Sequence, residues 1–175
     1  GVPFASVSPK QQVGRSGVAM DETQAAFDMV RHLAGLGHTR IAHIAGHPAH
    51  GASGWRLTGY RDGLAHAGIH YDASLVVQGE FSFESGARGA ERLLASRHPP
   101  TAIFAANDDM AAGVIRAAKL LGVDVPGQLS IAGCDDISLA SQLCPTLTTI
   151  RQPLSSMAER AALVLIGNAQ DESPL

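Results

Sequence analysis

The sequence predicts an α/β fold built on a doubly wound parallel sheet. Short apolar runs alternate along the chain with helical patterns that end at a glycine, an alternation typical of βαβ units. The run at residues 102–106 is apolar throughout, as expected where helices cover both faces of a parallel sheet. With 175 residues, of which 45% are hydrophobic, the chain is long and apolar enough to bury a core.

The first helix is predicted over residues 22–36. Asp21 precedes it as N-cap, Gln24 stands at the capping-box position, and Gly37 supplies the C-terminal stop. One face of this helix carries its apolar residues, which are Ala26, Met29, Val30 and Leu33. We therefore expect this face to pack on the sheet.

The remaining elements follow in the same alternation. Strands are predicted over residues 40–46, 74–78, 101–106 and 129–133. Helices are predicted over residues 53–67, 84–96 and 108–121. The regularity then breaks into a polar segment at 135–145, a short extended piece at 147–150, a last helix at 154–167 and a frayed tail at 171–175.

The two ends of the chain differ from its middle. Residues 1–20 contain only one or two short strand-like pieces, and the last helix has no neighbouring strands in the sequence to form a partner sheet. We expect these ends to be parts of a second lobe, either docked on a neighbouring chain or mobile.

Charge and composition exclude several classes of protein. The net charge is −3 and the lysines are Lys10 and Lys119 alone, so this chain carries no basic stripe for nucleic acid. Its apolar stretches are too short to span a membrane, and the first residues lack the basic start of a signal peptide. Cys134 and Cys144 have no C-x-x-C spacing, which favours free thiols in the cytoplasm.

Chemically versatile residues follow each predicted strand. In parallel sheets, ligands sit outside the carboxyl ends of the strands, where the loops after neighbouring strands meet. Those loops and the helix starts beyond them hold a guanidinium, an aromatic ring and several hydrogen-bonding groups, including Arg56, Phe81, Asn107 and Asp135. The set suits a small polyhydroxylated ligand, because carboxylates and amides bind pairs of hydroxyls and a ring offers a flat apolar face.

Each of these residues also has a purely structural interpretation. Asn107 or Asp108 could serve only as the N-cap of the following helix. Arg56 could be a solvated helix residue, and Phe81 a core aromatic. Only their convergence on one edge favours a binding site.

Catalytic and metal chemistry find less support. The acidic pairs at 108–109 and 135–136 are compatible with Mg²⁺, but no phosphate-binding loop and no lysine accompanies them. His43, His47 and His50 have no cysteine or carboxylate at zinc-ligand spacing. No serine lies in a G-x-S-x-G turn. We expect no metal, no cofactor and no enzymatic activity.

Several stretches in fixed order carry a specific pattern: HLAGLGHTRIA at 32–42, RLTGYR at 56–61, PPTAIFAAND at 99–108, VP at 125–126, GCDD at 133–136 and PTLTTIRQPL at 145–154. Together they resemble the LacI/GalR family of bacterial transcription regulators, in the effector-binding core that is similar to periplasmic sugar-binding proteins. The resemblance covers most of the chain.

The resemblance implies a type I periplasmic-binding-protein-like lobe at residues 21–149. Residues 1–20 and 150–175 would be remnants of a similar N-terminal lobe and its crossovers. In this family a sugar or related metabolite binds between the lobes, and lobe closure modulates DNA binding by a headpiece. No headpiece precedes Gly1, so we expect a truncated core that binds effector weakly and does not bind DNA. The family also implies a homodimer.

The resemblance also implies site residues. Arg56, Phe81, Asn107 and Asp135 match the family's effector contacts, whereas Asp21, His50, Ala52 and Gln152 fall where the family lines its cleft. Cys134 replaces an aromatic residue common in the family, which predicts a roomier pocket edge or altered packing. Two alternatives stay open, an exported substrate-binding protein of a sugar transporter and a Mg²⁺-dependent sugar-phosphate hydrolase.

Overall fold

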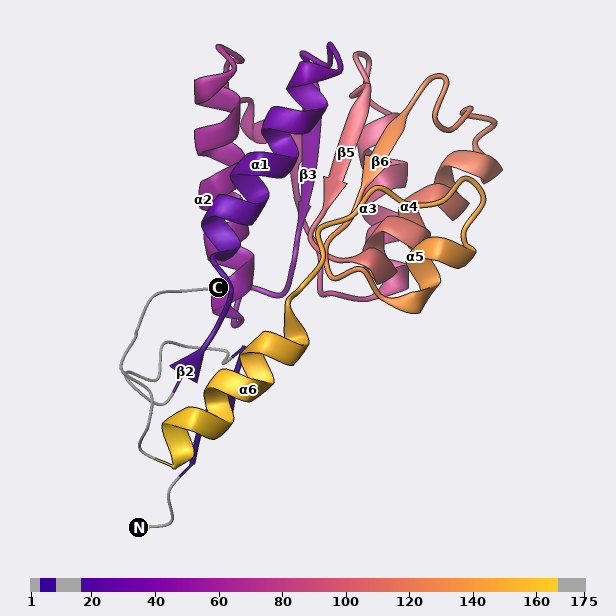
Figure 1. The fold of residues 1–175 in the computed structure, drawn as a ribbon. Helices are drawn as coiled ribbons and strands as arrows, with labels where there is room; N and C mark the ends of the chain where they lie inside the picture. The colour runs from indigo at the N-terminus through magenta and orange to yellow at the C-terminus, as the bar shows by residue number, and fades with distance from the viewer. Residues whose placement is uncertain (1–3, 9–16, 167–175) are drawn as a thin grey trace.

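Four parallel strands form the central sheet of the computed structural model, which describes residues 4–8 and 17–166 (Figure 1). The strands are β3 (Ile41–Ala45), β4 (Val76–Gln78), β5 (Ala102–Ala105) and β6 (Ser130–Ala132). Their order across the sheet is β4-β3-β5-β6, and every neighbouring pair is parallel. The predicted parallel sheet is confirmed.

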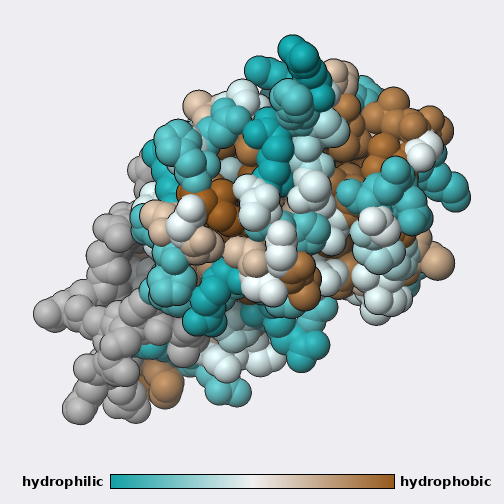
Figure 2. Space-filling view, turned by 90° about the horizontal axis from the view of Figure 1, so that it is seen from above, coloured by the Kyte–Doolittle hydropathy of each residue, from teal (hydrophilic) through white to brown (hydrophobic). Residues whose placement is uncertain are grey.

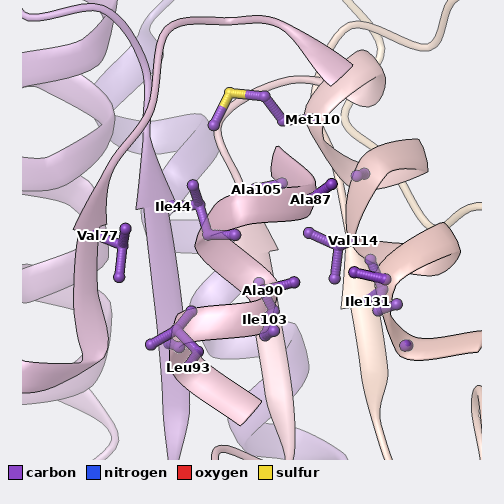
Figure 3. Close-up of a cluster of buried hydrophobic side chains, with 14 of the residues drawn as sticks. Ile44, Val77, Ala87, Ala90, Leu93, Ile103, Ala105, Met110, Val114 and Ile131 are labelled. Atoms are coloured by element: carbon purple, nitrogen blue, oxygen red, sulfur yellow. The ribbon is translucent and has the colours of Figure 1, made fainter. Parts of the chain in front are cut away.

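Two pairs of helices cover the two faces of this sheet. Helices α1 (Glu22–Gly35) and α2 (Gly51–His66) lie on one face, and α3 (Phe83–Leu94) and α4 (Asp108–Leu120) on the other. Neighbouring residues of β5 enter opposite cores, since Phe104 packs with the α1 and α2 side chains while Ile103 and Ala105 pack with those of α3 and α4 (Figure 3). This two-sided burial explains why β5 is apolar at every position.

Side-chain caps set several helix starts. Asp21 caps α1 as predicted, because its Oδ1 accepts a hydrogen bond from the backbone N–H of Gln24 at 2.8 Å. Ser82 caps α3 in a reciprocal capping box with Ser85. The backbone of Gly37 has a φ of +94°, the left-handed conformation expected just beyond a helix end.

Two segments differ from the sequence-based expectation. The first half of the strand predicted at 74–78 is the 3₁₀ turn η2 (Ala73–Leu75), because Asp72 accepts hydrogen bonds from both the backbone N–H and the hydroxyl of Ser74. The polar segment after β6 contains an unpredicted short helix, α5 (Ser138–Gln142). The extended piece at 147–150 lies beside β6, where Thr148 forms an isolated parallel bridge with Ala132.

The described parts of the two chain ends pack on each other. Strands β1 (Ser6–Val7) and β2 (Gly17–Val18) pair in parallel, and α6 (Leu154–Leu165) buries Met157 and Ala161 against Val18. The last helix, which has no strand near it in the sequence, thus packs on two short strands from the opposite end of the chain. The predicted tail at 171–175 lies outside the described residues.

Several large apolar side chains remain on the surface. Leu120 and Leu121 at the end of α4 are 67% and 53% exposed. The view from above shows hydrophobic side chains gathered on the side where α4 and the loop to β6 lie (Figure 2). Helix α6 and the residue after it likewise expose apolar side chains, namely Leu154, Leu163, Leu165 and Ile166.

Close packing of α3 on α4 yields a stability prediction. A Cβ added at Gly113 of α4 would lie 2.0 Å from the carbonyl oxygen of Phe83, which is backbone and cannot swing away. We therefore expect Gly113→Ala to lower the free energy of unfolding by about 1–3 kcal/mol. Urea unfolding measures the change.

A matched control lies on the exposed side of α2. A Cβ added at Gly54 meets no other atom within 4 Å. Gly54→Ala is therefore expected to stabilise the protein by roughly 0.5–1 kcal/mol through helix propensity. A destabilisation of equal size in both variants would contradict the packing argument.

Candidate functional site

The candidate site lies at the carboxyl ends of the sheet strands, which face the unit of β1, β2 and α6 (Figure 1). The chain leaves β3 toward β4 on one side and leaves β5 toward β6 on the other. The loops after β3 and β5 therefore diverge, and parallel sheets typically bind their ligands at such a point, so we call the region between these loops the candidate crevice. All eight predicted site residues lie in the loops and helix ends at this edge or in the crossover beside it.

Arg56 is the centre of the site. Its side chain is buried in α2 rather than solvated, so the solvated interpretation is wrong. Its Nε donates to Glu22 Oε2 at 2.7 Å, its Nη1 donates to the carbonyl of Ala106, and its Nη2 lies 3.6 Å from Asp135 Oδ1. One guanidinium therefore joins α1, α2 and the ends of β5 and β6.

Asp135 connects Arg56 to the crossover that leads into α6. Gln152 Nε2 donates to Asp135 Oδ1 at 2.6 Å, and the Gln152 backbone N–H donates to the Asp135 carbonyl. Burial raises the pKa of the Asp135 carboxyl, while Arg56 and the Gln152 hydrogen bond oppose that rise. Within the described ranges Oδ2 makes no hydrogen bond, and about a quarter of the side chain, 26%, is exposed. Asp135 therefore keeps an oxygen for a ligand.

Asn107 and Phe81 form a second group at the same edge. Asn107 Oδ1 accepts from the backbone N–H of Met110 at 3.0 Å, so the helix-capping interpretation of Asn107 is confirmed. Its Nδ2 donates one hydrogen to the Phe81 carbonyl at 3.3 Å, which leaves the second amide hydrogen for another acceptor. Phe81 itself is half-buried against the α3 and α4 core.

The Phe81 ring lies directly over Gly46, at the end of β3. A Cβ added at Gly46 would lie 2.0 Å from the ring Cζ, so only glycine permits this approach. His50, just before α2, is tilted by 58° to the same ring with centroids 5.5 Å apart. Together, Phe81 and His50 give this side of the crevice an aromatic wall.

Asp21 and Ala52 also lie at this edge, but among the described residues neither forms a hydrogen bond with Arg56, Asp135, Asn107 or Phe81. Asp21 is exposed and caps α1, one residue before Glu22. Ala52 is half-buried in the first turn of α2. A role for Asp21 and Ala52 in lining the crevice stays a prediction, and the structure shows Asp21 only as a helix cap.

The structure adds Glu22, which the sequence argument missed, and gives Asp108 a role other than the helix cap or Mg²⁺ ligand considered for it. Glu22 is buried beneath the site as the ion-pair partner of Arg56. Asp108 is fully buried, and both its oxygens are occupied, Oδ1 by the Thr149 hydroxyl at 2.5 Å and Oδ2 by the Ile137 N–H at 3.0 Å. Asp108 therefore holds the loops after β6 in place, which leaves it poorly suited to bind Mg²⁺.

A signal for Glu22 exists in the sequence. Position 22 falls on the same helical face as Ala26, Met29 and Leu33, so an acidic side chain there interrupts an apolar stripe. A carboxylate on a face that packs against a sheet needs a cationic partner. No comparable signal marks Asp108 as the anchor of Thr149.

Metal and thiol chemistry gain no support from the described part of the chain. In residues 4–8 and 17–166, no three His, Cys, Asp or Glu side chains are grouped so that they could hold a metal ion. Burial raises the pKa of the Cys134 thiol, which keeps it protonated beside Arg56. In the same residue ranges, no helix is long and apolar enough to cross a bilayer.

Comparison with known proteins agrees with this architecture. A family model described as a periplasmic binding protein-like domain matches residues 30–174. The HTH-type transcriptional regulator DegA of Bacillus subtilis (strain 168) is 41% identical over 161 residues, which is 91% of this chain and 48% of that protein. The HTH-type transcriptional repressor CytR of Escherichia coli (strain K12) is 40% identical over 155 residues, 89% of this chain and 46% of that protein. The chain thus spans about half the length of these regulators.

Solved structures agree as well. A sugar-binding transcriptional regulator of the LacI family from Escherichia coli, complexed with phosphate, superposes with a TM-score of 0.87 at 32% identity, covering 99% of this chain and 64% of that one. The transcriptional regulator CelR in complex with cellobiose gives 0.85 at 33% identity, covering 95% of this chain and 52% of that one. The chain belongs to the periplasmic binding protein-like domain family, in the form found in the effector-binding domains of LacI-family regulators.

Proposed function

We propose that the crevice at the carboxyl edge binds a small polyhydroxylated effector, a sugar or related metabolite. The observation that carries this proposal is the network of Arg56, Asp135 and Gln152 at the switch point of the sheet. The free oxygen of Asp135 can accept a hydrogen bond from a ligand hydroxyl, and the second amide hydrogen of Asn107 can be donated to one. The Phe81 ring offers a flat apolar face for the carbon skeleton of the ligand.

The same network suggests how binding is transmitted. Gln152 lies two residues before α6, which packs on β1 and β2. A ligand that contacts Asp135 and also the β1, β2 and α6 unit would favour one arrangement of the two units through its differential contacts. Closure of this kind would modulate DNA binding through a helix-turn-helix headpiece in the complete regulator. A homodimer and a cytoplasmic location are part of this proposal.

The relatives favour a regulator over the two alternatives. DegA, CytR and the phosphate-bound Escherichia coli structure are each described as a transcriptional regulator or repressor, rather than as a transporter component or a hydrolase. Two of the solved relatives are described as sugar-binding and as a cellobiose complex. A sugar is therefore the ligand class to test first.

The test is a thermal-shift screen of this chain against sugars, nucleosides and Mg²⁺. We expect a sugar or nucleoside to raise the melting temperature, with a dissociation constant weaker than about 1 μM. Asp135→Asn is expected to weaken that ligand roughly ten- to hundredfold, because a charge-assisted hydrogen bond to a hydroxyl becomes a neutral one. Isothermal titration measures the affinities.

Asp62→Asn is the matched control, since it removes the same charge from an exposed position on α2. We expect it to leave the affinity unchanged. Undiminished binding by Asp135→Asn would contradict the proposed site. If Mg²⁺ were the only compound to raise the melting temperature, the result would favour the alternative of a Mg²⁺-dependent sugar-phosphate hydrolase.

A further inference from the structure

A cavity of about 370 Å³ opens outside the edge strand β4, beside the proposed effector crevice. Its walls come from the end of β4, from α3 and from the loop after β3. This volume lies within the range of small-molecule sites. The chemistry of its walls differs from that of the effector crevice.

Two arginines on successive turns of α3 dominate this cavity. Arg88 and Arg92 are four residues apart, so they lie on the same face of the helix. Both are exposed, and neither makes a hydrogen bond or ion pair with a residue in the described ranges. Among the described residues that line the wall, Glu80 is the only acidic one, so this wall carries a net positive charge in a chain whose total is −3. Such a wall attracts an anion.

His47 supplies a further donor. Its Nδ1 accepts a hydrogen bond from the backbone N–H of Ala49 at 3.1 Å, so the neutral ring carries its proton on Nε2. Ser85, by contrast, is satisfied locally, since its hydroxyl accepts from the Glu80 N–H and donates to the Ser82 carbonyl. Ser85 therefore fixes the loop at the cavity mouth.

We propose that this cavity is a second ligand site, which takes a small phosphate monoester. Each guanidinium presents a planar fork that matches the oxygens of a phosphate dianion. Arg88 and Arg92 would hold the phosphate, and the Glu80 carboxylate would accept hydrogen bonds from hydroxyl groups on the organic part. The apolar wall at Val77 and Gly89 suits the carbon skeleton between them.

The position of the cavity connects it with the effector crevice. Gln78 Nε2 donates to the carbonyls of Gly46 and Gly79, and Gly46 lies under the Phe81 ring. Glu80 directly precedes Phe81, and the His47 and His50 rings are 5.7 Å apart. A phosphate ester in the cavity would thus contact both loops that form the aromatic wall of the crevice, and so influence effector affinity.

The test titrates this chain with glycerol 3-phosphate and, separately, with glycerol. We expect glycerol 3-phosphate to bind with a dissociation constant of roughly 1 mM or tighter, and glycerol to show no binding at the same concentrations. In ¹H–¹⁵N spectra, the amide signals that move are expected to be those of Glu80, Arg88 and Gly89. Movement confined to the signals of Asp135 and Asn107 would place the ligand in the effector crevice. That result would overturn the proposed phosphate site but not the proposed effector site.

Two double variants distinguish specific phosphate binding in this cavity from a general attraction of the anion to positive charge on the protein. Arg88→Gln with Arg92→Gln is expected to weaken glycerol 3-phosphate about tenfold or more. Arg97→Gln with Arg116→Gln removes the same charge from exposed positions outside the cavity and is expected to leave the affinity unchanged. Equal losses in both double variants, or no loss in the first, would overturn the proposal.

Discussion

Arg56→Met is expected to lower the free energy of unfolding by about 3–5 kcal/mol, the usual cost of removing one partner from a buried ion pair. Arg56 and Glu22 are each about 95% buried, and they are joined by a 2.7 Å hydrogen bond. Methionine fills much of the volume but leaves the Glu22 carboxylate and the Ala106 carbonyl without their donors. Urea unfolding at pH 7 measures the loss.

Two further variants identify the cause of that loss. Adding Glu22→Gln to Arg56→Met neutralises the stranded carboxylate, so the double variant is expected to be more stable than Arg56→Met by about 1 kcal/mol or more. Arg31→Met breaks an exposed ion pair with Asp28 and is expected to cost less than about 1 kcal/mol. If Arg56→Met cost no more than Arg31→Met, the burial argument would be wrong.

The regular part of the fold was predictable because its signals are local. Apolar periodicity, capping residues and glycine stops located each major helix to within a few residues, as at Asp21 and Gly37. The end of α1 and the start of α4 are examples in which the cap and the apolar stripe agree. Parallel pairing followed from the uniformly apolar strand β5.

The elements that escaped prediction lack such local signals. Helix α5 has five residues and no side-chain cap at Ile137, so nothing in its sequence distinguishes it from a loop. The pairing of β1 with β2 involves two residues from each strand, and it is stabilised by Met157 of α6, far away in the sequence. Contacts of this kind depend on tertiary packing rather than on propensity.

The candidate site was likewise predictable only in part. Convergence of Arg56 and Asp135 on one edge follows from the topology of a parallel sheet, and it was predicted. The detailed network was not, because Glu22 pairs with Arg56 across 34 residues and Gln152 reaches Asp135 across 17. Asn107 shows that its two interpretations are compatible, since its amide group caps α4 and keeps a hydrogen that the proposed ligand could accept.

Stability is expected to fall as the pH drops from 7 toward 4, because His43 must stay neutral in the folded protein. His43 lies fully buried in β3 between the rings of Tyr60 and Phe104. Burial lowers its pKa from 6.5 to about 4, and the nearby charge of Arg56 acts in the same direction. Its Nδ1–H donates to the Phe104 carbonyl, whereas Nε2, where a proton would add, has no partner among the described residues.

The direction of the effect follows from proton linkage. The unfolded chain takes up a proton on His43 below pH 6.5, and the folded protein does so only near pH 4. The contribution of neutral His43 to the free energy of unfolding is therefore complete above pH 6.5. It is lost progressively toward pH 4, and the total loss is up to roughly 3 kcal/mol. His38, whose pKa is also lowered by burial, adds a loss of the same sign. Urea unfolding at intervals between pH 7.5 and 4.5 measures the slope of the free energy of unfolding against pH.

His43→Phe isolates the contribution of this one ring. Phenylalanine keeps the aromatic packing against Tyr60 but cannot take up a proton, so most of the slope between pH 6.5 and 4.5 is expected to disappear. His70→Asn, at an exposed position, is expected to leave the slope intact. If the pH dependence of His43→Phe matched that of the unmodified chain, the acid sensitivity would have to arise from other groups. A reduced slope would instead identify a buried neutral histidine in the central sheet as the main source of acid instability, even though it lies outside the proposed binding sites.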